Sequence, residues 1–220
     1  MRVLAVDTST PCGSVAVVGP EGVVAQTRLA AASGHSRWLL PAVDALLRGL
    51  DLAPAALEAF AVTTGPGSFT GLRVGLSTTQ GLALASGRPC VGLPTLDVLG
   101  LAAAGLADTL VTLMDAFRGE VYSAVYDAAG ARRREARVGL LEAALEGLPP
   151  GAAFVGDAVA SSRSRIADAV PGALFPAVEP FLAAPLGRAA LVCLERGETI
   201  AASRLRPLYL RGAAATLPRP

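Results

Sequence analysis

Carboxylates and hydroxyls gather where apolar runs of the sequence end. Residues 2–6 are typical of a buried strand that ends at Asp7, with Thr8 and Ser9 next in the chain. A second apolar run ends in the same way at Asp115. A third run leads into Gly65-Pro66-Gly67, and a glycine turn that opens a helix is a generic anion site. Each carboxylate equally suits the capping of a turn.

Other chemistries are excluded by residues that the chain lacks. All 19 basic residues are Arg, so a P-loop lysine and a Schiff-base lysine are ruled out. His35 is the single histidine, and the three cysteines form no CxxC pair, which argues against a zinc site and against a two-histidine metal site. The net charge of +1 gives no general reason to bind nucleic acid, although Arg132–Arg134 with Arg137, and Arg204, Arg206 and Arg211, form local clusters.

The elements that must position these residues follow from periodicity and turn signals. They predict strands at 2–6, 14–18, 23–29, 59–64, 90–93, 110–115 and 121–126, and helices at about 36–50, 68–86 and 94–107. The order strand, carboxylate, turn and return strand occurs twice, about a hundred residues apart. We therefore predict two related α/β lobes, each a mixed sheet with flanking helices, at residues 1–104 and 105–220.

The helix predicted at 68–86 is unusual because it contains three glycines. Each costs about 0.5–1 kcal/mol relative to Ala, so a close approach by another element is expected to compensate. That element is either the chain's own sheet or a helix of a partner chain. For a partner contact, the candidate residues on the helices at 36–50 and 68–86 are Leu39, Val43, Leu46, Leu47, Gly71, Val74, Gly75, Thr78 and Leu82.

Five stretches, taken together, resemble the TsaB (YeaZ) family. They are Leu4-Ala5-Val6-Asp7-Thr8-Ser9, Thr64 through Arg73, Gln80-Gly81-Leu82-Ala83-Leu84, Asp115 through Tyr122, and Pro207-Leu208-Tyr209-Leu210-Arg211. The resemblance implies the actin-like, sugar-kinase-like (ASKHA) fold. It also implies a non-catalytic scaffold subunit of the assembly that forms N6-threonylcarbamoyladenosine in tRNA.

In that family the expected partners are the transferase subunit TsaD and the ATPase TsaE, and tRNA is reached through the complex. The resemblance implies pairing with TsaD through helices of the first lobe, and a homodimer is expected when the chain is alone. ATP and a metal are expected in the other subunits, with no cofactor in this chain. We expect a cytoplasmic protein without a membrane segment, since charged residues interrupt every apolar run before about 20 residues.

The resemblance also argues against catalysis by this chain. TsaD holds its metal with a His-x-x-x-His motif, and those two positions fall here on Thr95 and Leu99. Asp7, Thr8, Ser9 and Asp115 stand where the fold places its phosphate and magnesium ligands, so a vestigial nucleotide site is expected at most. The alternative is a nucleotide-binding actin-like kinase or ATPase that acts alone.

Overall fold

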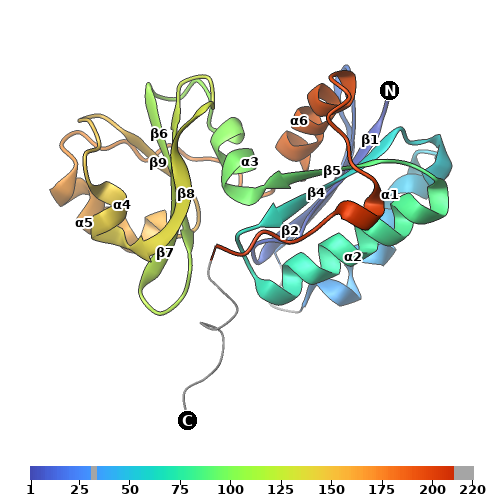
Figure 1. Ribbon diagram of the computed structural model, residues 1–220, viewed down its shortest axis with the longest axis horizontal. Coiled ribbons are helices and arrows are strands. Elements are labelled where there is room, and N and C mark those ends of the chain that lie inside the picture. The colour runs from blue at the N-terminus through green and yellow to red at the C-terminus, as the bar shows by residue number, and fades with distance from the viewer. Residues whose placement is uncertain (31–33, 211–220) are drawn as a thin grey trace, which may run out of the picture. The chain divides into compact units, whose positions relative to one another are not determined.

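The computed structural model describes residues 1–30 and 34–210, and the chain divides into two units (Figure 1). The first unit contains Met1–Val98 and Phe181–Pro207. The second contains Leu99–Pro180 and, among the described residues, 208–210. Each unit is built on one sheet, and each is described by itself.

The sheet of the first unit has five strands in the order β3-β2-β1-β4-β5. Its strands are β1 (Val3–Asp7), β2 (Cys12–Gly19), β3 (Gly22–Ala30), β4 (Ala59–Gly65) and β5 (Cys90–Pro94). The first three form an antiparallel meander, whereas β4 and β5 extend the sheet in parallel from β1. β1 and β4 are buried along their whole length, as is typical of central strands covered on both faces.

Helices cover both faces of this sheet (Figure 1). On one face lie α1 (Leu39–Gly49) and α2 (Phe69–Ser86), whose buried side chains form a core with alternate residues of the strands, among them Leu4 and Val6. On the other face lies α6 (Ala183–Glu195), where Gly187 packs directly on Val18 and Ala5. The described residues of this unit also form the short 3₁₀ helices η1 (His35–Arg37), η2 (Pro54–Ala56) and η3 (Ala202–Arg204).

Both ends of α2 have the local signals that the sequence predicted. The Ser68 side chain caps the first turn by accepting a hydrogen bond from the Gly71 amide at 3.2 Å. Gly87 ends the helix in the left-handed conformation at φ 63°. α1 begins at Leu39, so Pro41 lies in its first turn, where a missing amide costs no hydrogen bond.

The second unit has a four-stranded sheet in the order β8-β7-β6-β9. Its elements are α3 (Thr95–Ala102, which begins in the first unit), β6 (Thr109–Asp115), β7 (Glu120–Asp127), β8 (Arg132–Leu140), α4 (Leu141–Leu145), β9 (Ala153–Val155) and α5 (Val159–Ala169). β6 is antiparallel to β7 and parallel to β9, the same mixed pairing that β1 makes in the first unit. Side chains of α4 and α5 pack with Val111 and Leu113 in a separate core.

The predicted division at residue 104 needs correction. The chain leaves the first unit after Val98 and returns to it at Phe181, because α6 packs on β1 and β2. Arg211, which ends the last family-like stretch and the second Arg cluster, lies outside the described residues. Within 1–30 and 34–210, no helix combines the length and the apolar character needed to span a membrane.

Candidate functional site

Asp7 is the last residue of β1, and its side chain is fully buried. Its Oδ1 accepts hydrogen bonds from the Ser9 amide at 3.1 Å, the Ser9 hydroxyl at 2.6 Å and the Thr63 hydroxyl at 2.7 Å. Its Oδ2 is buried and has no hydrogen-bond partner in the described part of the chain. Burial raises the pKa of Asp7 above its ordinary value of 3.8, although the bonds from Ser9 and Thr63 act in the opposite direction. The fold thus shifts this carboxyl toward its neutral form.

The turn after Asp7 is packed against the start of α2. The Thr8 hydroxyl donates to the Gly71 carbonyl at 2.8 Å, and the Ser68 amide donates to the Ser9 carbonyl at 2.7 Å. A methyl group on Gly67 or Gly71 would overlap the carbonyl oxygens of Ser9 and Thr8, respectively. Gly67 also has a φ of 156°, a conformation that L side chains rarely adopt. These glycines are therefore required by the close approach of the two segments.

His35 holds the same turn from the other side. Its Nδ1 accepts a hydrogen bond from the Trp38 indole at 3.1 Å, which places the ring proton on Nε2. That Nε2 then donates to the Thr10 carbonyl at 2.9 Å. The ring also lies against Gly13 and Gly71, where an added methyl group would crowd it. With both nitrogens engaged, His35 is a structural clamp and lacks a free nitrogen for acid–base chemistry.

Several groups around Asp7 that could hold a nucleotide phosphate or its magnesium ion are engaged within the chain. A phosphate turn presents free amides and hydroxyls to the ligand. Here the Ser9 amide and hydroxyl point to Asp7, and the Ser68 amide at the start of α2 is used by Ser9. Asp7 has no exposed oxygen to offer a cation. In the described residues, no group of three or more His, Cys, Asp and Glu side chains is arranged to hold a metal ion.

Asp115, the fourth residue of the predicted nucleotide site, belongs to the second unit and ends β6. Its Oδ1 accepts a hydrogen bond from the Phe117 amide at 2.7 Å, while its own amide donates to Asp157 Oδ1 at 2.9 Å. Burial and the charge of Asp115 raise the pKa of Asp157, although bonds from backbone amides lower it. Asp115 therefore caps the β6–β7 turn, the alternative that the sequence left open.

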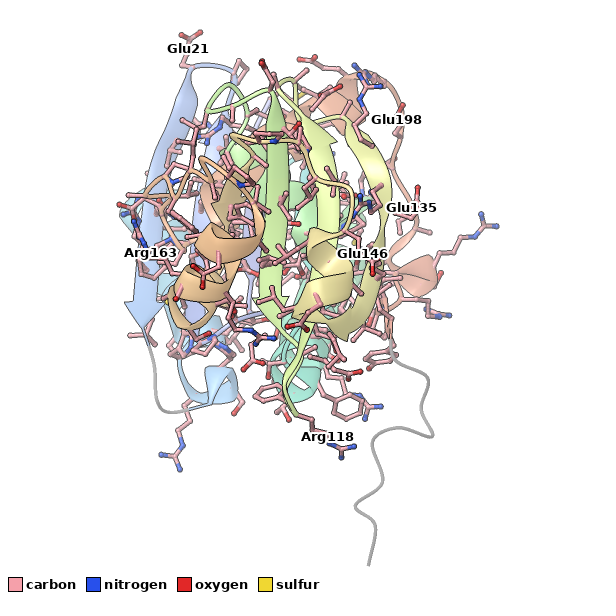
Figure 2. The ribbon with its side chains drawn as sticks, turned by 90° about the vertical axis from the view of Figure 1, so that its left-hand side faces the viewer. Glu21, Arg118, Glu135, Glu146, Arg163 and Glu198 are labelled. Atoms are coloured by element: carbon pink, nitrogen blue, oxygen red, sulfur yellow. The ribbon has the colours of Figure 1, made fainter. Side chains whose placement is uncertain are left out.

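That turn holds two non-glycine residues in the left-handed conformation, Phe117 at φ 59° and Arg118 at φ 57°. Phe117 is 66% exposed. Figure 2 shows Arg118 at the tip of the turn, with its side chain directed away from the sheet. The hydrogen bond from the Phe117 amide to Asp115 contributes to holding this conformation.

The Arg cluster at 132–134 and 137 lies on β8 and is engaged within the second unit. The pairs are Arg132 with Glu135, Arg133 with Asp127, Arg134 with the Glu146 carbonyl and Arg137 with the Ala143 carbonyl. A cavity of about 350 Å³ opens beside Arg133 and Arg134. The Asp127 carboxylate balances the charge of Arg133, whereas Arg134 is held by the neutral carbonyls of Ala144 and Glu146.

The predicted partner stripe on α1 needs correction. All four residues, Leu39, Val43, Leu46 and Leu47, are buried in the core of the first unit. The apolar spacing that suggested a contact surface is the ordinary core-facing stripe of an amphipathic helix. These four side chains cover the apolar face of the sheet under α1, so they are not available to a partner.

The predicted stripe on α2 is also corrected in part. Gly71 and Gly75 are buried, and a methyl group on Gly75 would overlap the Thr8 hydroxyl. Val74, Thr78 and Leu82 are half-buried. The exposed face is displaced by about one residue and consists of Phe69, Thr70, Arg73, Ser77, Gly81, Leu84 and Ala85. Sequence spacing alone did not reveal this face, because apolar and small residues occur on both sides of α2.

Comparisons with known proteins give the sequence relationship. A family model described as TsaD, tRNA N6-adenosine threonylcarbamoyltransferase, matches residues 21–203. The tRNA threonylcarbamoyladenosine biosynthesis proteins TsaB of Bacillus subtilis and Escherichia coli are 32% and 38% identical over 126 and 128 residues, which is 57% of this chain in each case. The matches span only 55% of the length of those relatives. An uncharacterised protein of Mycobacterium tuberculosis is 37% identical over 95% of this chain and 91% of its own length.

Solved structures extend the comparison to most of the chain. A protein of Pseudomonas aeruginosa described as similar to peptidase YEAZ superposes with a TM-score of 0.82 at 30% identity, covering 96% of this chain and 99% of its own. An activator of 2-hydroxyisocaproyl-CoA dehydratase from Clostridium difficile shares the fold at a TM-score of 0.54 and 10% identity, covering 90% and 97% of the two chains. The predicted actin-like, sugar-kinase-like fold is confirmed by these neighbours and by the two mixed sheets with flanking helices.

Proposed function

The chain belongs to the TsaB/YeaZ family, and on that premise we propose that it takes part in forming N6-threonylcarbamoyladenosine in tRNA. In this proposal it is a non-catalytic subunit that pairs with a TsaD-type transferase. It works with a TsaE-type ATPase and meets tRNA only within that complex. The sequence match to proteins named for this biosynthesis is the observation that carries the proposal.

The environment of the polar residues supports a non-catalytic role. Asp7 is buried with Oδ1 engaged by three donors, and both nitrogens of His35 are used by the fold. Thr95 and Leu99, which replace the metal-binding histidines of the resembled transferase, are themselves buried. A threonine hydroxyl is a poor ligand for a transition metal and a leucine is none.

The exposed face of α2 is the surface that we propose for the transferase. It is built mostly of small and apolar residues, and Leu84 is 65% exposed. Small side chains allow two helices to approach closely, and Leu84, in the last turn of α2, offers an exposed apolar side chain for a partner to desolvate. The same face is free to pair with a second copy when the transferase is absent, which would give a homodimer that competes with the complex.

Binding to the purified TsaD-type protein of the same organism tests this proposal. We expect the wild-type chain to form a complex by gel filtration and to stimulate threonylcarbamoyl transfer when TsaE, ATP and tRNA are supplied. Leu84→Arg would bury an unpaired charge in the contact, so we expect its Kd to rise at least about 30-fold, the scale of a hot-spot residue. Leu106→Arg is the matched control, because Leu106 is a 47% exposed leucine of the second unit.

Three results would contradict parts of the proposal. Absence of any complex with the wild-type chain would refute the pairing with a transferase. Wild-type affinity of Leu84→Arg would place the contact away from this face. Threonylcarbamoyl transfer by the chain alone would refute its non-catalytic role.

A further inference from the structure

The turn after β1 is joined to the first two turns of α2 by a set of contacts that the proposed function does not explain. Thr8 is central, because its hydroxyl donates to the Gly71 carbonyl at 2.8 Å and lies where a side chain at Gly75 would begin. Ser9 adds the bond from the Ser68 amide at 2.7 Å. Thr8 is 1% exposed, so it cannot itself touch a partner.

These contacts fix both the rotation and the height of α2 over the sheet. Gly71 and Gly75 are four residues apart, so both face the turn on one side of the helix. A rotation of α2 would break the bond from Thr8 to Gly71, and a displacement along its axis would drive the Thr8 hydroxyl into the helix. The buried Thr8 hydroxyl therefore determines where the outward-facing residues of α2, such as Ser77 and Leu84, are positioned.

We propose that Thr8 is a positioning residue for the partner face of α2. In nucleotide-binding proteins the corresponding turn carries ligand-binding groups. Here the turn supports α2, and the Thr8 hydroxyl donates its hydrogen bond to the Gly71 carbonyl. The inference rests on the proposed pairing through α2. It assigns a role in that pairing to a residue that lies beneath the contact surface.

Thr8→Val and Thr8→Ser separate the hydroxyl from the bulk of the side chain. Val keeps the branched shape and removes the donor, whereas Ser keeps the donor and removes a methyl group. For Thr8→Val we expect the Kd for the TsaD-type protein to rise at least about tenfold. For Thr8→Ser we expect it to stay within about threefold of wild type. Amide hydrogen exchange of Gly71 and Leu72, measured without any partner, should accelerate in Thr8→Val and stay near wild type in Thr8→Ser.

A stability control distinguishes positioning from general loosening of the fold. Val3 is fully buried on β1 and shares the strand side of Ala5, which packs on α6 and not on α2. Val3→Ala removes buried volume at a distance from the turn. At a temperature where Val3→Ala and Thr8→Val have the same folded fraction, we expect only Thr8→Val to lose affinity.

The outcomes separate this inference from the proposed function. If Leu84→Arg weakens the complex while Thr8→Val binds and exchanges like wild type, the positioning role is wrong and the pairing surface stands. If Val3→Ala loses as much affinity as Thr8→Val, the effect is one of stability and the role of Thr8 is also refuted. If the wild-type chain forms no complex at all, the proposed function fails, and the role assigned to Thr8 fails with it, whatever the exchange data show.

Discussion

A methyl group added at Gly75 should destabilise the first unit, although alanine is the better helix former. Gly75 is buried in α2, and the new Cβ would overlap the Thr8 hydroxyl. That hydroxyl cannot turn away without losing its 2.8 Å bond to the Gly71 carbonyl.

The size of the effect follows from three terms. Overpacking of a core costs about 1–3 kcal/mol, and loss of the buried Thr8 hydrogen bond costs about 1 kcal/mol. Replacing a helical glycine by alanine returns about 0.5–1 kcal/mol. We therefore expect Gly75→Ala to lower the free energy of unfolding by about 2 kcal/mol, measured by urea denaturation followed by circular dichroism.

Gly81 gives the matched control on the same helix. It is exposed, and nothing lies within 4 Å of the position where its Cβ would stand, so Gly81→Ala should raise the free energy of unfolding by about 0.5–1 kcal/mol. In a double-mutant cycle, Thr8→Ala should remove most of the penalty of Gly75→Ala, because the overlapping hydroxyl is gone. Equal stabilisation at both glycines, or additive effects of Thr8→Ala and Gly75→Ala, would refute the packing argument.

Two further predictions concern a buried acid and a strained turn. Because burial raises the pKa of Asp7 above 3.8, the folded state keeps a proton that the unfolded state releases, so this residue's contribution to stability is lost as pH rises from 3.8 through the folded pKa. In urea titrations between pH 3 and 8, the free energy of unfolding of Asp7→Asn should not show this decrease. Identical pH profiles for the wild type and Asp7→Asn would contradict the prediction. Phe117→Asn should raise the free energy of unfolding by about 0.5–1 kcal/mol, because asparagine tolerates a φ of 59° better. A loss of 1 kcal/mol or more would show that the phenyl ring contributes a stabilising contact.

Local signals predicted the first unit well. The boundaries of α2 follow from Ser68 and Gly87, which act through hydrogen bonds and dihedral angles within one helical turn. β1, β2 and β4 follow from apolar runs bounded by turn residues. In each case the residues that specify the element lie inside it or beside it, so sequence reading suffices.

Elements that depend on distant contacts were missed. No boundaries were predicted for β8, α4, β9, α5 and α6, which lie between the family-like stretches at 115–122 and 207–211. α6 is the consequential case, since its place on β1 and β2 depends on Gly187 meeting Val18 across the chain. No local pattern at 183–195 predicts that contact. The sequence therefore did not show that the chain returns to the first unit, and the predicted division at residue 104 was wrong.

The sequence predicted where Asp7, Thr8 and Ser9 lie but not which groups they bind. Asp7, Thr8 and Ser9 do form a buried turn at a strand end, and the same local sequence suits either a phosphate or a packed helix. What decides between them is the partner of each donor, and that is set by segments more than 50 residues away: Thr63, Ser68 and Gly71. Spacing within the turn carries no information on those partners.

The three glycines of α2 answer different needs, although the sequence shows them as one pattern. The absence of a side chain at Gly71 and Gly75 leaves room for Thr8, so these two glycines serve the chain's own packing. Beyond its chain neighbours and the adjoining backbone of α2, no atom of the described residues lies within 4 Å of where a Cβ at Gly81 would stand, and Gly81 lies on the exposed face with Ser77 and Leu84. At Gly81, the proposed contact with a partner helix would compensate the cost of about 0.5–1 kcal/mol that a helical glycine carries. The chain's own packing thus explains Gly71 and Gly75, whereas contact with a partner helix stays a prediction for Gly81.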